Sequence, residues 1–276
     1  MANITAADVN KLRTMTGAGM MDCKKALVEA DGDFETAIDN LRKKGQKVAA
    51  NRGDREAKEG LVIAKVTKDN KRGALVVLNC ETDFVAKNDD FTKLANSLAD
   101  LAVEKNPADL EELKNLALNG STVADKIIEY VGKIGEKIEL SRYEKVEAAK
   151  VVAYNHPGNK LATIVGFNQS GDKVEQLAKE VAMQVAAMAP ISVDKGDVDT
   201  KTLERELEIA KEQARQEGKP EEMLEKIAIG KLNKFYKEST LLNQEFIIDS
   251  KKTVGQYLKE TDGNLTVTGF KRVSLN

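Results

Sequence analysis

The side chains that most often carry covalent or metal chemistry are scarce in this sequence. It contains one histidine, His156, and two cysteines, Cys23 and Cys80, in 276 residues. A zinc site needs about four ligands, mostly sulfur or nitrogen, and a cysteine nucleophile needs a neighbouring base. Since neither cysteine has the histidine near it in sequence, we expect no metal site and no catalytic residue.

Glycine patterns that hold phosphate groups are incomplete. Gly17-Ala18-Gly19 begins like a dinucleotide-binding fingerprint, but Asp22 stands where the third glycine belongs and no strand pattern precedes it. No G-x-x-x-x-G-K-[ST] phosphate loop occurs in the sequence. We therefore expect that the protein binds no nucleotide directly and carries no cofactor.

Carboxylates surround an apolar pair, Phe84 and Val85. A hydrolase that uses Asp83, Asp89 and Asp90 is disfavoured, because no nucleophile, general base or metal cluster accompanies them. Aromatic residues are few, with seven Phe and five Tyr, so a Phe in a charged loop stands out. Covering an exposed Phe84 with a partner would contribute ~1.5 to 3 kcal/mol. Alternatively Phe84 packs beneath its own helix, and the spacing leaves both possibilities open.

Two adjacent methionines follow the glycine-rich turn at residues 16–19. Met20 and Met21 begin a predicted helix, and consecutive helical residues cannot both face one small core. We expect one to be exposed, where a flexible apolar side chain suits a partner surface, and the other to lie in the core. The alternative, in which both fill gaps in that core, stays open.

Composition limits the classes of partner. Hydrophobic residues make up 41% of the chain and charged residues 32%, and 43 Lys+Arg balance 45 Asp+Glu at a net charge of -2. This balance is typical of globular domains and does not favour nucleic acid or anionic lipid. The longest stretch without a charge, residues 181–193, is shorter than the ~18 residues of a membrane span, and the N-terminus lacks a secretory pattern. We expect a cytoplasmic protein without membrane contact.

The N-terminal part has the pattern of a helical module. Over residues 1–45 the apolar spacing predicts three short helices, and Asp33 can cap the third. The run 42–58 carries seven basic and two acidic residues and has almost nothing to bury. We therefore expect an exposed basic linker over residues 46–58.

An internal repeat organises the rest of the chain. Val62-Ile63-Ala64 matches Val151-Val152-Ala153 at an offset of 89, and both copies read as β-hairpins. We expect a first repeat over residues 59–140 and a second over residues 141–276.

A helix follows each hairpin, and the two helices match at an offset of 83, with Leu94-Ala95 on Leu177-Ala178. The first copy therefore holds six additional residues between hairpin and helix. Both copies need the same core, so we expect function where they differ. The insertion includes Phe84.

The second repeat also contains a predicted helical hairpin, at about residues 198–242, which reverses at Gly218-Lys219-Pro220. One helix has a seam that steps four, three and four residues, formed by Leu203, Leu207, Ala210 and Ala214. This spacing indicates an antiparallel coiled coil, and the charged outer faces favour a hairpin that protrudes. Together these elements predict an α+β fold.

The single histidine lies at the predicted tip of the second hairpin, in Tyr154-Asn155-His156-Pro157-Gly158. A general base needs a partner that it can exchange protons with or be oriented by. With no second titratable partner identified near it, His156 reads as a turn residue.

Two long motifs resemble the bacterial translation elongation factor Ts family. They are TGAGMMDCKKAL at residues 16–27 and NCETDFVAK at residues 79–87, and the similarity extends to His156-Pro157-Gly158 and to residues 252–259. The resemblance implies a guanine nucleotide exchange factor for elongation factor Tu that performs no covalent chemistry. It also implies a ubiquitin-associated-like three-helix module, a two-part α+β core and a protruding coiled coil.

The resemblance also implies roles for individual residues. One stretch enters the GTPase domain of elongation factor Tu and disturbs its magnesium and phosphate site, so that GDP leaves and GTP rebinds: Thr82, Asp83, Phe84 and Val85. Other residues approach the partner: Leu12, Met20, Met21 and His156. Self-association through the helical hairpin is a further expectation.

The main alternative is a nucleic-acid-binding translation accessory protein, in which residues 42–58 follow a phosphate backbone. The net charge of -2 and the lack of aromatic residues in that run count against it. Binding to nucleic acid would weaken steeply with added salt, whereas a partly apolar protein interface would weaken much less.

Overall fold

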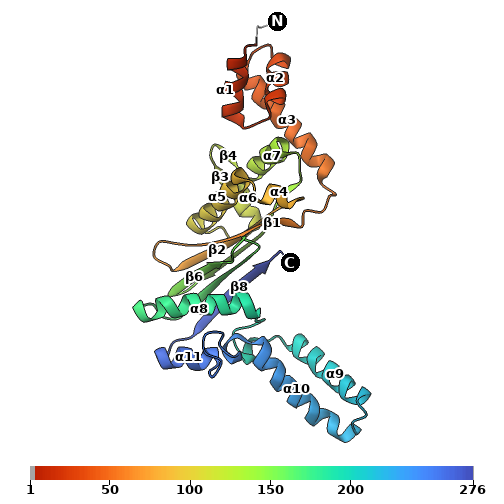
Figure 1. Cartoon of the computed structure of the whole chain (residues 1–276), viewed down its shortest axis with the longest axis vertical. Coiled ribbons are helices and arrows are strands. Elements are labelled where there is room, and N and C mark those ends of the chain that lie inside the picture. Colours follow the sequence, from red (N-terminus) through yellow and green to blue (C-terminus); the bar gives the residue numbers. More distant parts are fainter. Residues whose placement is uncertain (1–3, 276) are drawn as a thin grey trace. The chain divides into compact units, whose positions relative to one another are not determined.

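A computed structural model describes residues 4–275 and shows the predicted α+β fold (Figure 1). The chain divides into two compact units. The described part of the first contains residues 4–63, 76–144 and 275, and the second contains residues 64–75 and 145–274. The elements up to residue 147 are α1 (Ala6–Thr16), α2 (Met20–Glu29), α3 (Phe34–Arg52), β1 (Glu59–Val66), β2 (Arg72–Cys80), α4 (Asp83–Ala86), α5 (Asp89–Lys105), α6 (Leu110–Asn115), β3 (Ala117–Leu118), β4 (Ser121–Thr122), α7 (Val123–Ile134) and β5 (Ile138–Glu147).

Local sequence signals fix the ends of the first three helices. Thr5 caps α1 in a capping box with Asp8, and the α1 helix ends at Gly17, whose φ of 66° is the left-handed conformation that glycine adopts without strain. Asp33 accepts a hydrogen bond from the Thr36 backbone N–H, as predicted. The three helices enclose a small core of Val9, Leu12, Cys23, Ala26, Leu27 and Ala37.

The predicted linker is corrected in its first half. Helix α3 continues to Arg52, because residues 42–52 contain no proline and are rich in Lys, Arg, Gln and Ala, which favour helix. The continuation also has something to bury, since Gly45 packs against Gly132 of α7. A Cβ added at Gly132 would lie 2.8 Å from the Gly45 Cα, so the two helices meet backbone to backbone.

The internal repeat is present in the structure. In the first hairpin the Thr67 N–H donates to Arg72 O at 2.9 Å, and in the second the His156 N–H donates to Leu161 O, also at 2.9 Å, 89 positions later. Both turns place an asparagine in the left-handed conformation, Asn70 with φ 54° and its counterpart with φ 53°. The sheet orders also agree, β1-β2-β5 in one copy and β6-β7-β8 in the other.

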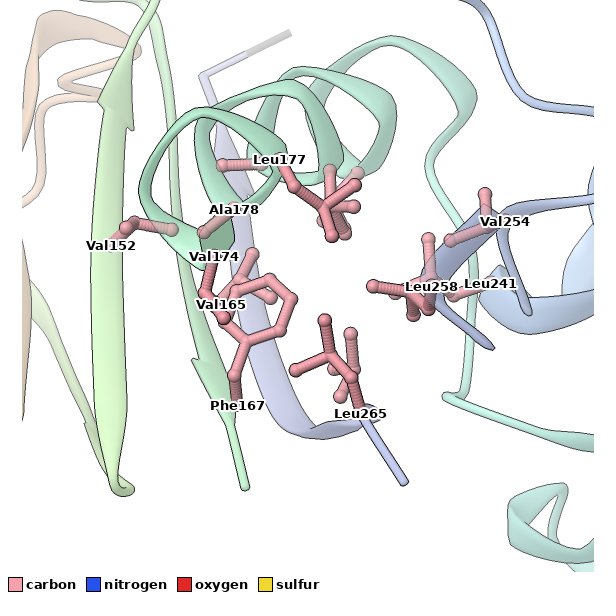
Figure 2. Close-up of a cluster of buried hydrophobic side chains, with 14 of the residues drawn as sticks. Val152, Val165, Phe167, Val174, Leu177, Ala178, Leu241, Val254, Leu258 and Leu265 are labelled. Atoms are coloured by element: carbon pink, nitrogen blue, oxygen red, sulfur yellow. The ribbon is translucent and has the colours of Figure 1, made fainter. Parts of the chain in front are cut away.

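The second repeat contains the remaining elements. They are β6 (Lys150–Asn155), β7 (Leu161–Phe167), α8 (Asp172–Met188), η1 (Lys195–Asp197), α9 (Thr200–Gln216), η2 (Glu221–Met223), α10 (Leu224–Ser239), η3 (Leu241–Asn243), α11 (Val254–Thr261) and β8 (Val267–Ser274). Helix α8 matches α5 residue for residue at the predicted offset of 83. Figure 2 shows the core of this unit, in which Phe167 of β7 lies among side chains of α8, α11 and the segment before β8.

Helices α9 and α10 form a hairpin that packs along its own seam. Ala210 and Ala214 of α9 are buried, as are Leu224 and Ala228 of α10, and Lys211 pairs with Glu225 across the hairpin at 3.0 Å. The Ile191 N–H donates to Ser239 O at 2.8 Å. The chain that enters the hairpin therefore lies beside the chain that leaves it.

The backbone contact between α3 and α7 leads to a prediction about stability. Replacing Gly132 by Ala forces the helices apart, and overpacking of this kind costs about 1 to 3 kcal/mol, more than the gain in helix propensity. We expect a lower melting temperature. Gly230→Ala in α10 is the control, because nothing lies within 4 Å of its added Cβ. It should be neutral or stabilising, and a Gly132→Ala variant as stable as this control would contradict the prediction.

Candidate functional site

The segment that distinguishes the two repeats contains one turn of helix, α4, between β2 and α5. Thr82 is its N-cap and accepts a hydrogen bond from the Val85 N–H at 3.5 Å. The turn directs Ala86 into the core and leaves Phe84 81% exposed. Of the two possibilities that the sequence left open for Phe84, the structure therefore has the exposed one.

Asp83 lies beside Phe84 and is half-buried. Its carboxylate pairs with Lys87 at 2.6 Å, one helical turn later, and this hydrogen bond, together with the charge of Asp83, raises the pKa of Lys87. Exposed pairs at this spacing contribute about 0.3 to 0.5 kcal/mol, so a partner can displace Lys87 at little cost. Across residues 4–275 no group of three or more His, Cys, Asp or Glu side chains is arranged to hold a metal ion.

Glu136 holds the start of α4. Its two carboxylate oxygens accept hydrogen bonds from the Thr82 N–H at 3.0 Å and from the Thr82 hydroxyl at 2.7 Å. Hydrogen bonds to a charged acceptor contribute about 1.5 to 3 kcal/mol when partly buried. Nothing in the sequence links Glu136 to residues 54 positions earlier, and sequence analysis missed it.

Glu81 joins the same loop to two other segments. Its carboxylate accepts hydrogen bonds from Arg52 at 2.7 Å, from Arg55 at 3.2 Å and from the Lys137 backbone N–H at 2.6 Å. Burial would raise the pKa of Glu81, but these three donors outweigh it and hold the pKa below its ordinary value. The network therefore stabilises the fold above the ordinary pKa of glutamate, and its contribution is lost as the pH falls through the lowered value.

The same contacts correct the interpretation of the basic run 42–58. Two of its seven basic side chains, Arg52 and Arg55, are directed to Glu81. They complete an internal ion network, so they are not available to follow a phosphate backbone.

The methionine expectation is wrong in one respect. Met20 and Met21 are both exposed, at 53% and 74%. Helix α2 begins at Met20, but its buried face begins only at Cys23. That face continues with Ala26 and Leu27. The first turn therefore lies outside the core.

Leu12 has the opposite environment. Its side chain is fully buried in the core of the three helices. The expectation that Leu12 touches a partner is therefore incompatible with the folded module, in which Leu12 fixes α1 against α2 and α3.

His156 is exposed at the turn between β6 and β7 of the second unit. The expectation that no titratable group accompanies it is wrong, because the Tyr154 hydroxyl lies 2.9 Å from its Nδ1. Residues i and i+2 of a strand point to the same face, and this rule could have identified Tyr154 from the sequence.

No helix within residues 4–275 combines the length and the apolar character needed to cross a bilayer.

Comparisons with known proteins agree along the chain. A family model described as Elongation factor TS matches residues 81–276. The chain is 57% identical over 275 residues to elongation factor Ts of Flavobacterium psychrophilum, with 100% of each chain covered. It is 54% identical over 275 residues to elongation factor Ts of Christiangramia forsetii and 55% identical over 278 residues to that of Cytophaga hutchinsonii, again with 100% of each chain covered.

The contact between Glu136 and Thr82 makes a prediction about the loop. In Glu136→Ala both donors of Thr82 lose their acceptor, so the amides of residues 82–87 should exchange hydrogen faster while those of β2 stay protected. Glu139→Ala removes an exposed carboxylate on the adjacent strand and should leave the loop unchanged. Hydrogen exchange read by mass spectrometry measures both, and equal protection of the loop in the two variants would disprove the anchoring role.

Proposed function

This chain belongs to the elongation factor Ts family, the guanine nucleotide exchange factors of elongation factor Tu, and we propose how its own residues perform that exchange. The protein binds elongation factor Tu that carries GDP and disturbs the magnesium and phosphate site, so that GDP leaves and GTP rebinds. The observation that carries this mechanism is the exposed Phe84 on α4, an element that only the first repeat has.

The energetics follow from linkage. A protein that binds nucleotide-free elongation factor Tu more tightly than the GDP form must weaken GDP binding by the same factor. No covalent bond is formed or broken, so the activity needs no catalytic residue or cofactor in this chain. Magnesium bridges phosphate oxygens and neutralises their charge, and moving its ligands removes much of what holds GDP.

Residues of α4 and its cap have distinct tasks in this proposal. The ring of Phe84 displaces packed side chains of the GTPase domain, and Asp83 brings a negative charge towards the magnesium site. Thr82 and Val85 hold the turn, since one is its N-cap and the other is bonded to that cap.

Other exposed residues supply affinity. Met20 and Met21 offer flexible apolar surface to the same GTPase domain. Leu12 acts indirectly, by fixing the helix that precedes them. His156 is a further contact, made from the second unit.

Finer features of the architecture are part of the proposal. The module at residues 1–45 is ubiquitin-associated-like, and α9 with α10 forms a protruding coiled coil within about residues 198–242. The first repeat runs from residue 59 to the end of β5 at Glu147, later than the boundary at residue 140 that the sequence suggested, and the second begins with β6 at Lys150. The protein acts in the cytoplasm, where elongation factor Tu works, and the hairpin is the surface for any self-association.

The exposed ring makes the first prediction of this proposal. Phe84→Ala should lower the rate of GDP release from elongation factor Tu by ~10- to 100-fold, the equivalent of 1.5 to 3 kcal/mol of lost burial. The melting temperature should stay almost unchanged. Release of fluorescent GDP and a melting curve measure the two quantities.

Phe91→Ala is the matched control. Phe91 is fully buried seven positions later, and its loss should cost about 3 to 5 kcal/mol of stability. If Phe84→Ala destabilises the fold as Phe91→Ala does, or exchanges GDP at the normal rate, the wedge mechanism is wrong.

The hairpin makes the second prediction. Deleting residues 201–237 and closing the gap with a short Gly/Ser linker should leave a folded core that still promotes GDP release, because the chain before the hairpin is hydrogen-bonded at Ile191 to the chain after it at Ser239. Loss should appear instead in affinity or self-association. Circular dichroism and a melting curve on the deletion variant test this, and a core that fails to fold would show that the hairpin is an integral layer of the second repeat.

A further inference from the structure

Three consecutive residues at the second hairpin turn are each held by a separate set of contacts. The backbone of His156 is fixed on both sides, because its N–H donates to Leu161 O and its carbonyl accepts from the Asn159 N–H, both at 2.9 Å. The residue carrying the exposed imidazole therefore has a defined position in the turn.

Asn155 ties this turn to the neighbouring hairpin. Its side-chain amide donates to Ala64 O at 2.9 Å and accepts from the Ala64 N–H at 2.8 Å. The two bonds use one donor and one acceptor of the amide, which fixes its orientation. Both residues belong to the second compact unit.

The imidazole ring itself is held by Tyr154. The Tyr154 hydroxyl lies 2.9 Å from Nδ1 of His156, and the two ring centroids are 5.9 Å apart. In a neutral imidazole one ring nitrogen accepts, and a phenol is a better donor than acceptor, so the arrangement that suits both groups has the hydroxyl donating to Nδ1. The ring proton then sits on Nε2, which makes no hydrogen bond within residues 4–275.

The equivalent turn of the first repeat is built differently. Thr67 stands at the position of His156, and its hydroxyl is used within its own turn, where it donates to Asp69 at 2.5 Å and accepts from the Arg72 N–H at 3.1 Å. Both turns share their backbone bonds, so the turn requires neither the imidazole nor the Tyr154 hydroxyl. The pair of Tyr154 and His156 therefore occurs in only one of the two repeats, just as α4 does.

We infer that Tyr154 is a positioning residue that holds His156 in the Nε2–H form and so presents a fixed N–H donor to an oxygen acceptor on the protein partner. The inference rests on the proposed function, which makes His156 a contact with elongation factor Tu. A ring that is already oriented loses less conformational entropy on binding than a free one.

Because His156 is the single histidine of the chain, nuclear magnetic resonance can read its tautomer without ambiguity. Protein labelled with ¹⁵N-histidine is measured at a pH about two units above the ordinary histidine value of ~6.5. We expect Nδ1 to resonate as an unprotonated nitrogen and Nε2 as a protonated one. In Tyr154→Phe both resonances should move towards the tautomer average of free histidine, while Tyr143→Phe, which removes a hydroxyl bonded to Pro107 O at 3.1 Å, should leave them unchanged.

Affinity for elongation factor Tu is measured in parallel. Tyr154→Phe should weaken binding about 2- to 10-fold, the range of one lost hydrogen bond. The same change should have no further effect in a His156→Ala background. His156→Gln, whose amide can place an N–H near the position of Nε2, should retain more affinity than His156→Asn.

The outcomes separate the inference from the proposed function. If Tyr154→Phe leaves the nitrogen resonances unchanged, or if Nδ1 carries the proton, the inference is overturned even when exchange activity is normal. If the tautomer shifts but His156→Ala binds as tightly as wild type, the contact is overturned, and with it the positioning role. If wild type itself does not bind elongation factor Tu, the proposed function fails, and the resonances still report whether Tyr154 fixes the ring.

Discussion

The carboxylate of Glu81 connects three segments that are far apart in sequence. It accepts hydrogen bonds from Arg52 at the end of α3, from Arg55 just after that helix, and from the Lys137 backbone N–H before β5. Glu81 itself ends the hairpin and begins the loop that carries α4. One partly buried group therefore sets the position of the functional loop against both the N-terminal helices and the sheet. Removing Arg52, the less exposed of the two arginines, would leave the Glu81 charge without full compensation, which costs more than an ordinary hydrogen bond contributes.

The two repeats show which features the fold needs and which it does not. Hairpin turn, following helix and strand order recur, so they are requirements of the core. The copies differ in several elements, among them the α4 turn in the first, and in the second the α9–α10 hairpin and the imidazole at position 156. The α4 turn and the α9–α10 hairpin are elements that the other copy does without, whereas His156 is a different side chain on a turn that both copies share. Comparing the two repeats of one chain thus distinguishes residues needed for packing from residues available for function, without a second sequence.

Much of this could be predicted from local signals. The Asp33 cap, the offsets of 89 and 83 and the extra residues around Phe84 are all short-range or periodic patterns, and they were predicted correctly. The contact between Glu136 and Thr82 and the close approach of Gly45 to Gly132 could not be predicted, because they join segments whose spacing carries no period. Burial of individual side chains in a small module is also hard to predict, since moving a helix start by one residue changes which positions face inward.

The length of α4 explains why its surroundings matter more than its own sequence. A helix of four residues is unstable alone, because the entropy lost in forming the first turn exceeds the free energy gained from its few hydrogen bonds. Its shape must therefore come from Thr82, Glu136 and Glu81. A side chain held this way keeps its direction before a partner arrives, so less entropy is lost when the ring of Phe84 is buried. The partly buried contacts of Glu81 and Glu136 therefore hold the turn, and the turn holds the exposed ring of Phe84 rigidly enough to act as a wedge.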